Sequence, residues 1–146
     1  MNGLSALRTY RNVSTQSAVV DSSPHQLVLM LIDGAIEKTA KAVGHMHHGD
    51  TAQKGELLSG GIAIIDALRS SLDHRSGGEL ADNLERLYDY MIRRLLEGNL
   101  QNDSQALTEV ISLLKEIREA WVAIPQDYRG AGSDPAAATL LSFARQ

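Results

Sequence analysis

The side chains of this sequence that could do chemistry, by type and spacing, are its histidines. His45, His47 and His48 stand close to Asp50. In a helix, His45 and His48 lie about one turn apart, so both imidazoles could touch one metal ion. A solvated helix end, where histidine also suits the helix dipole, explains the same group more simply. We therefore predict no metal site and no cofactor.

The other two histidines do not predict catalysis either. His25 follows a helix start signal, and His74 stands in a turn beside Arg75, whereas a phosphotransfer histidine sits in mid-helix on an exposed face of its bundle. No Glu-x-x-His pair is present for a two-metal bundle. Neither a glycine-rich phosphate loop followed by lysine nor a Gly-x-Ser-x-Gly elbow occurs. We predict a protein without catalytic residues that is not an enzyme.

Four stretches with apolar residues at helical spacing must form the scaffold. Ser23 can cap the first, Pro24 suits its first position and Gln26 stands three residues after the cap, which predicts a helix over about 24–47. Asp50 can cap the second helix, which ends near Asp73.

The second half of the chain repeats this pattern. A turn over 74–78 is followed by a third helix that ends near Leu100, and Ser76 with Glu79 could form its capping box. Asn102 and Asp103 form the next turn and cap, and the fourth helix ends at Pro125. The third helix has a dense apolar stripe made of Leu80, Leu84, Leu87, Tyr88, Met91, Leu95 and Leu96.

Composition supports a helical fold. The 146 residues are 43% apolar and only 4% aromatic, which suits one helical domain with an aliphatic core. Four helices joined by short turns predict an all-α fold, an antiparallel up-down four-helix bundle. We expect a single domain over 1–146, with a mobile N-terminal arm or short helix over 1–22, the bundle over 23–125, and a linker with a tail or short C-terminal helix over 126–146.

Charge and local hydropathy exclude several classes of protein. The net charge of −4 disfavours a nucleic-acid binder, which would normally have a basic face. The sequence contains no cysteine, so it has no disulfide. We see neither a secretory signal at the start nor an apolar stretch long enough for a membrane span, and we expect a cytoplasmic protein without membrane insertion.

Some apolar residues exceed what one core stripe needs. Leu57 and Ile64 lie off the main stripe of the second helix. Tyr90 lies about 200° around the third helix from Tyr88, on the same face as Arg94. Exposed apolar patches often mark interfaces, so these residues predict a binding surface. The apolar residues of the N-terminal arm, Leu4, Leu7 and Tyr10, could cover it removably.

Three segments resemble the flagellin export chaperone family, commonly called FliS. They are SSPHQLVLMLIDGAI (22–36), GGELADNLERLYDYMIRRLLEGNLQND (77–103) and LTEVISLLKEIREAW (107–121). Their order and spacing agree with the family, and the resemblance covers about residues 8–122. The chain departs from the family at Ile32, where tyrosine is frequent, and at Gly98, where alanine is frequent.

The resemblance implies a helical bundle without enzymatic activity that holds the C-terminal segment of flagellin, prevents premature polymerisation and delivers flagellin to the flagellar export apparatus. It also implies that the arm, with Tyr10, covers part of the groove in the free protein, as a lid or as a clamp. A flagellar anti-sigma factor could be a second partner, and the protein could be a monomer or a weak homodimer. The candidate flagellin-binding residues are Leu7, Tyr10, Leu57, Ile64, Leu68, Leu87, Tyr90 and Arg94.

Two other functions compete with this one. The first is a His-phosphotransfer-like signalling bundle, and the second is a structural homodimer that uses the same apolar patch. Trp121 stands in register with Leu114 and Ile117, which predicts a mainly structural role for its side chain.

Overall fold

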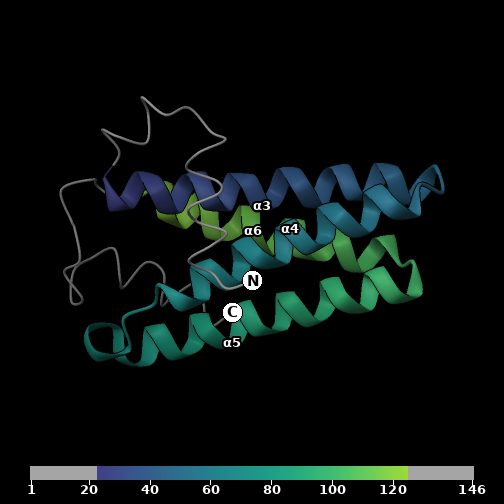
Figure 1. Cartoon of the computed structure of the whole chain (residues 1–146). Helices are drawn as coiled ribbons and strands as arrows, with labels where there is room; N and C mark the ends of the chain where they lie inside the picture. Colours follow the sequence, from purple (N-terminus) through teal and green to yellow (C-terminus); the bar gives the residue numbers. More distant parts are fainter. Residues whose placement is uncertain (1–22, 125–146) are drawn as a thin grey trace.

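The computed structural model describes residues 23–124, and these residues form four helices (Figure 1). The helices are α3 (Pro24–His47), α4 (Thr51–Ser70), α5 (His74–Gln101) and α6 (Ser104–Val122). The described part of the chain has no strand. The predicted all-α four-helix bundle is confirmed.

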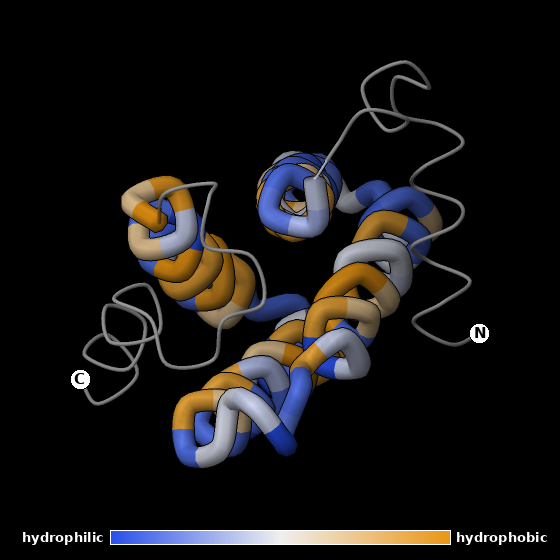
Figure 2. Tube along the Cα trace, turned by 90° about the vertical axis from the view of Figure 1, so that its left-hand side faces the viewer, coloured by the Kyte–Doolittle hydropathy of each residue, from blue (hydrophilic) through white to orange (hydrophobic). Residues whose placement is uncertain are grey.

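Each helix packs beside two others. α3 lies against α4 and α6, and α5 lies against the same two helices, so the four form a closed ring of neighbours. Successive helices run in opposite directions (Figure 1). Figure 2 shows hydrophobic positions recurring along the helices between hydrophilic ones, which is the pattern of helices that are buried on one side.

Side-chain caps start α3, α4 and α6 where the sequence predicted them. Ser23 Oγ accepts from the backbone N–H of Gln26, whose side chain accepts from the backbone N–H of Ser23, so the capping box before Pro24 is confirmed. Asp50 caps α4 and Asp103 caps α6. The two partners of each capping hydrogen bond are at most three residues apart in the sequence, so the local sequence was enough to predict them.

The connection between α4 and α5 differs from the prediction. α4 ends at Ser70, and Asp73 rather than Ser76 is the N-cap, because the Asp73 carboxylate accepts from the backbone N–H groups of Arg75 and Ser76. One helical turn follows, and Gly78 then interrupts the helix with φ of 50°. This left-handed conformation suits glycine, which has no Cβ, and it kinks the start of α5.

The core is aliphatic, as the composition predicted. Thr39, fully buried, donates its hydroxyl hydrogen to the carbonyl of Ala35 at 2.8 Å, which satisfies its polar group inside the core. The largest fully buried apolar side chains come from all four helices: Ile32, Leu58, Ile65, Leu68, Met91, Leu95, Leu107, Val110, Leu114 and Ile117.

Gly98 of α5 packs closely against the start of α6. A Cβ at this position would lie 2.5 Å from Leu107 Cδ1 and 3.1 Å from the carbonyl oxygen of Asp103. The glycine therefore lets the end of α5 lie directly on the start of α6.

Candidate functional site

The predicted apolar surface of α4 is mostly core. Ile64 and Leu68 each have only 2% of their surface exposed and belong to the main hydrophobic cluster. The prediction that Ile64 is surplus apolar surface was wrong. Leu57 is partly buried and packs on the same cluster. Leu7 and Tyr10 lie outside the described residues.

The position of α4 in the bundle explains this burial. α4 packs against both α3 and α5, so it needs an apolar stripe toward each. Gly60 and Gly61 face Lys38 and Thr39 of α3. Ile64 stands one helical turn after these glycines and therefore lies on the side that meets α3.

The predicted face of α5 away from the core does carry Tyr90 and Arg94. Tyr90 Oη donates to Glu109 Oε2 at 2.6 Å, and Arg94 Nε donates to Glu109 Oε1 at 2.8 Å. Arg94 also bonds Glu97, and the Arg93 guanidinium lies 6.0 Å from the centre of the Tyr90 ring. Leu87, on the neighbouring turn, is partly buried against the core. This polar network joins α5 to α6 at their exposed seam.

The shared carboxylate of this network is held in its charged form. The hydrogen bond from Tyr90, with a smaller contribution from Arg94, lowers the pKa of Glu109 below its ordinary value. The same hydrogen bond raises the pKa of Tyr90. Tyr90 therefore presents a polar edge at this seam, whereas Tyr88 is buried in the core.

α5 also exposes an apolar pair that the sequence analysis did not select. Leu96 is 53% exposed and Leu100 is 86% exposed, and they lie one turn apart on the same face. The prediction that Leu96 belongs to the core stripe was wrong, because it lies about 100° around the helix from the buried Leu95. The angle of about 100° between Leu95 and Leu96 follows from the sequence, and it could have identified Leu96 and Leu100 as an exposed pair.

At the end of the bundle where α3 begins and α6 ends, His25 and Trp121 join these two helices. Their rings stack with centroids 5.5 Å apart and an angle of 19° between the planes. Trp121 Nε1 donates to the carbonyl of His25 at 3.0 Å, and His25 Nε2 donates to the carbonyl of Trp121 at 2.9 Å. Nδ1 of His25 is buried without a hydrogen-bond partner among the described residues. Because His25 is 6% exposed, it does not have the surface position that a phosphotransfer histidine needs.

The opposite end of the bundle has a polar pocket of about 270 Å³. Lys54, which lines it, is 5% exposed and donates to the carbonyl of Asn99 and to Oδ1 of Asn102, both at 3.1 Å. The first bond gives a donor to a backbone carbonyl in the last turn of α5, which has no partner within the helix, so the lysine caps the C-terminal end of α5. His45 Nδ1 lies 3.2 Å from Asp50 Oδ2 at the same pocket.

No helix among residues 23–124 combines the length and the apolar character that crossing a membrane requires.

The chain matches a known protein family. The model of the family described as flagellar protein FliS matches residues 6–128, which include the whole described bundle.

The chain is also similar to individual proteins named flagellar secretion chaperones. The chain is 52% identical to the flagellar secretion chaperone FliS of Salmonella typhimurium over 121 residues, which cover 82% of this chain and 90% of that protein. It is 44% identical to the flagellar secretion chaperone FliSB of Pseudomonas aeruginosa over 85% of this chain and 98% of that protein. The FliS protein of Bacillus subtilis is 32% identical over 78% of this chain and 84% of that protein.

Proposed function

The chain belongs to the FliS family of flagellar proteins, and from this membership we propose that it is a flagellar secretion chaperone whose client is flagellin. The match over residues 6–128 is the observation that carries the proposal. Relatives at 52% and 44% identity are named flagellar secretion chaperones, and their matches cover most of both chains. We propose that the protein works by binding in the cytoplasm, without catalysis, and passes its client to the flagellar export apparatus.

The physical role of such a chaperone is to occupy a client segment that would otherwise associate with other subunits. We propose that this segment is the C-terminal part of flagellin, as the family resemblance implies. An amphipathic segment can fold as a helix on an apolar surface of the bundle. Ordering a flexible client costs free energy, so the contact must be large. Release then needs only a competitor for the same surface.

The exposed part of α5 is the best supported place for contact within the described residues. Leu96 and Leu100 offer exposed apolar surface, and Tyr90 with Arg94 offers a polar edge at the seam with α6. Leu57 and Leu87 stay candidates for the contact because part of each side chain is exposed. Ile64 and Leu68 are no longer candidates because both are buried in the hydrophobic core. The covering role of Leu7 and Tyr10, and a flagellar anti-sigma factor as second partner, stay predictions from the sequence.

Deleting the C-terminal segment of flagellin is expected to weaken binding to this chain at least tenfold, because the deleted segment supplies most of the contact area. Isothermal titration calorimetry with purified flagellin and the full chain measures this, and the control is a flagellin with an N-terminal deletion of equal length. Equal affinity for the full-length and C-terminally shortened flagellins would refute the choice of client segment.

Replacing Leu96 and Leu100 together with serine is expected to lower the affinity for flagellin about tenfold and to leave the melting temperature unchanged. Both side chains are exposed, so the folded bundle loses little, while the complex loses apolar contact. Val122→Ser is the matched control, because Val122 is also exposed, at 51%, but stands on α6. A double variant that binds flagellin as tightly as the unchanged chain would remove this face from the proposed contact.

A further inference from the structure

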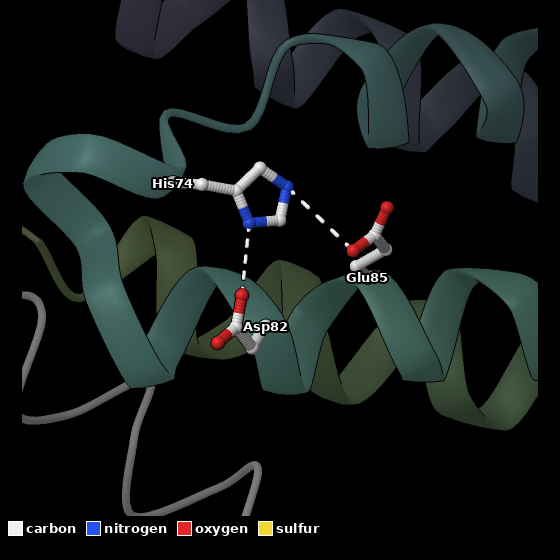
Figure 3. Close-up of side chains that lie close together, drawn as sticks. All are labelled: His74, Asp82 and Glu85. Carbon is white, nitrogen blue, oxygen red and sulfur yellow. Dashed lines mark hydrogen bonds and ion pairs between the residues drawn. The ribbon is translucent and has the colours of Figure 1, made fainter.

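Three potential metal ligands converge at the start of α5 (Figure 3). His74 Nδ1 lies 3.0 Å from Asp82 Oδ1, and His74 Nε2 lies 3.7 Å from Glu85 Oε1. One ligand atom from each of the three residues can be chosen so that all lie within 4.8 Å of one another. In Figure 3 the imidazole stands between the two carboxylates.

The kink at Gly78 brings these residues together. Asp82 and Glu85 lie three residues apart and so share a face of α5. His74 precedes Asp82 by eight residues, and a straight helix would place it about 12 Å further along the axis. The left-handed conformation of Gly78 instead turns the first turn of α5, residues 74–77, back toward the rest of the same helix. Spacing along the sequence alone could not show this approach.

The charge of the cluster is unbalanced. Within residues 23–124, the ion pairs of Asp82 and Glu85 are with His74, and no lysine or arginine pairs with either carboxylate. The nearby Arg86 donates to Asn83 instead. Elsewhere in the bundle, Asp89 pairs with Arg69 and Glu109 pairs with Arg94. Two carboxylates beside one imidazole thus form a local negative centre that a dication would neutralise.

We propose that His74, Asp82 and Glu85 bind a divalent transition-metal ion of the Zn²⁺ type. The ion would take one imidazole nitrogen and one oxygen from each carboxylate, with water in the remaining positions. A mixed nitrogen and oxygen ligand set suits Zn²⁺, whereas Mg²⁺ and Ca²⁺ prefer oxygen ligands alone.

Such coordination requires the side chains to change rotamer. Ligands at about 2.1 Å from a tetrahedral Zn²⁺ lie about 3.4 Å from one another. One ligand atom from each of the three residues already lies within 4.8 Å of the other two. Because His74 turns Nδ1 toward Asp82 and Nε2 toward Glu85, the imidazole must rotate so that one nitrogen and both carboxylates reach the same ion. The side chains of the three residues are 42% to 58% exposed, so rotamer changes are sterically open to them. A bound ion would tie the turn before Gly78 to the body of α5.

Calorimetric titration of Zn²⁺ into the full chain, freed of any histidine tag, tests the site. We expect the His74→Ala variant and the Asp82→Asn/Glu85→Gln double variant each to lose at least tenfold in affinity. Mg²⁺ and Ca²⁺ at the same concentration should not bind. The matched control is His47→Ala/His48→Ala, which removes the other histidine group and should leave the Zn²⁺ affinity unchanged.

A second measurement locates the ion. Hydrogen exchange of the backbone amides over residues 75–78 should slow when Zn²⁺ is added to the unchanged chain and should not respond in His74→Ala. If the affinity survives His74→Ala, or if it falls in the His47→Ala/His48→Ala control instead, the ion binds elsewhere and the proposal is wrong. Circular dichroism of each variant verifies that the bundle is intact.

Discussion

Replacing Trp121 with alanine is expected to lower the free energy of unfolding by about 3 kcal/mol, at the lower end of the range for tryptophan because the side chain is half-buried. The substitution removes the stack on His25 and the hydrogen bond from Nε1 to the His25 carbonyl. It also uncovers Ile124, which packs against the indole. Urea unfolding followed by circular dichroism measures the change.

Two further variants separate the contributions of this residue. Trp121→Phe keeps an aromatic ring but loses the Nε1 donor, and it should cost less than the alanine change, with about 1 kcal/mol from the hydrogen bond. Val122→Ala, at an exposed neighbour, should change stability by no more than about 0.5 kcal/mol. An alanine variant that melts normally but no longer binds flagellin would show that Trp121 belongs to the interface.

Replacing Ile64 with alanine is expected to cost about 3 kcal/mol of stability and to leave flagellin affinity unchanged at temperatures where the variant is folded. The side chain is 2% exposed inside the main cluster, so its removal loses burial and leaves a cavity. Thermal unfolding and calorimetric binding of the same preparation give both quantities.

Leu57→Ala is the matched control for Ile64→Ala. Leu57 stands on α4 two helical turns before Ile64 and is only partly buried. Its truncation should therefore cost clearly less stability than that of Ile64. If Ile64→Ala were as stable as the unchanged chain but bound flagellin more weakly, Ile64 would belong to the contact surface, as the sequence analysis predicted.

The starts of α3, α4 and α6 could be predicted because their signals are local. The capping box of Ser23 and Gln26 and the cap at Asp103 each use backbone groups within three residues. The predicted ends of α4, near Asp73, and of α6, at Pro125, each lie three residues beyond the observed ends at Ser70 and Val122. The start of α5 was missed because two caps competed there. Asp73 and Ser76 both suit an N-cap, and the choice between them depends on the conformation of Gly78, which composition does not reveal.

The surface of the bundle was harder to predict than its helices. Whether Ile64 is buried depends on α4 having neighbours on two sides, and this is a property of the assembled ring. The bonds of Tyr90 and Arg94 to Glu109 join two helices, so the spacing within one helix could place the first two residues on a face but could not supply their partner.

The contact of His25 with Trp121 also has a consequence for folding kinetics. It joins residues 96 positions apart, which is nearly the whole length of the described bundle. The loop that must close to form it is long, whereas the contacts between successive helices close short loops and cost less entropy. Docking of α6 on α3 through this contact thus costs more loop-closure entropy than docking of successive helices on each other. Since Trp121 is the single tryptophan of the chain, its fluorescence reports directly on that closing step.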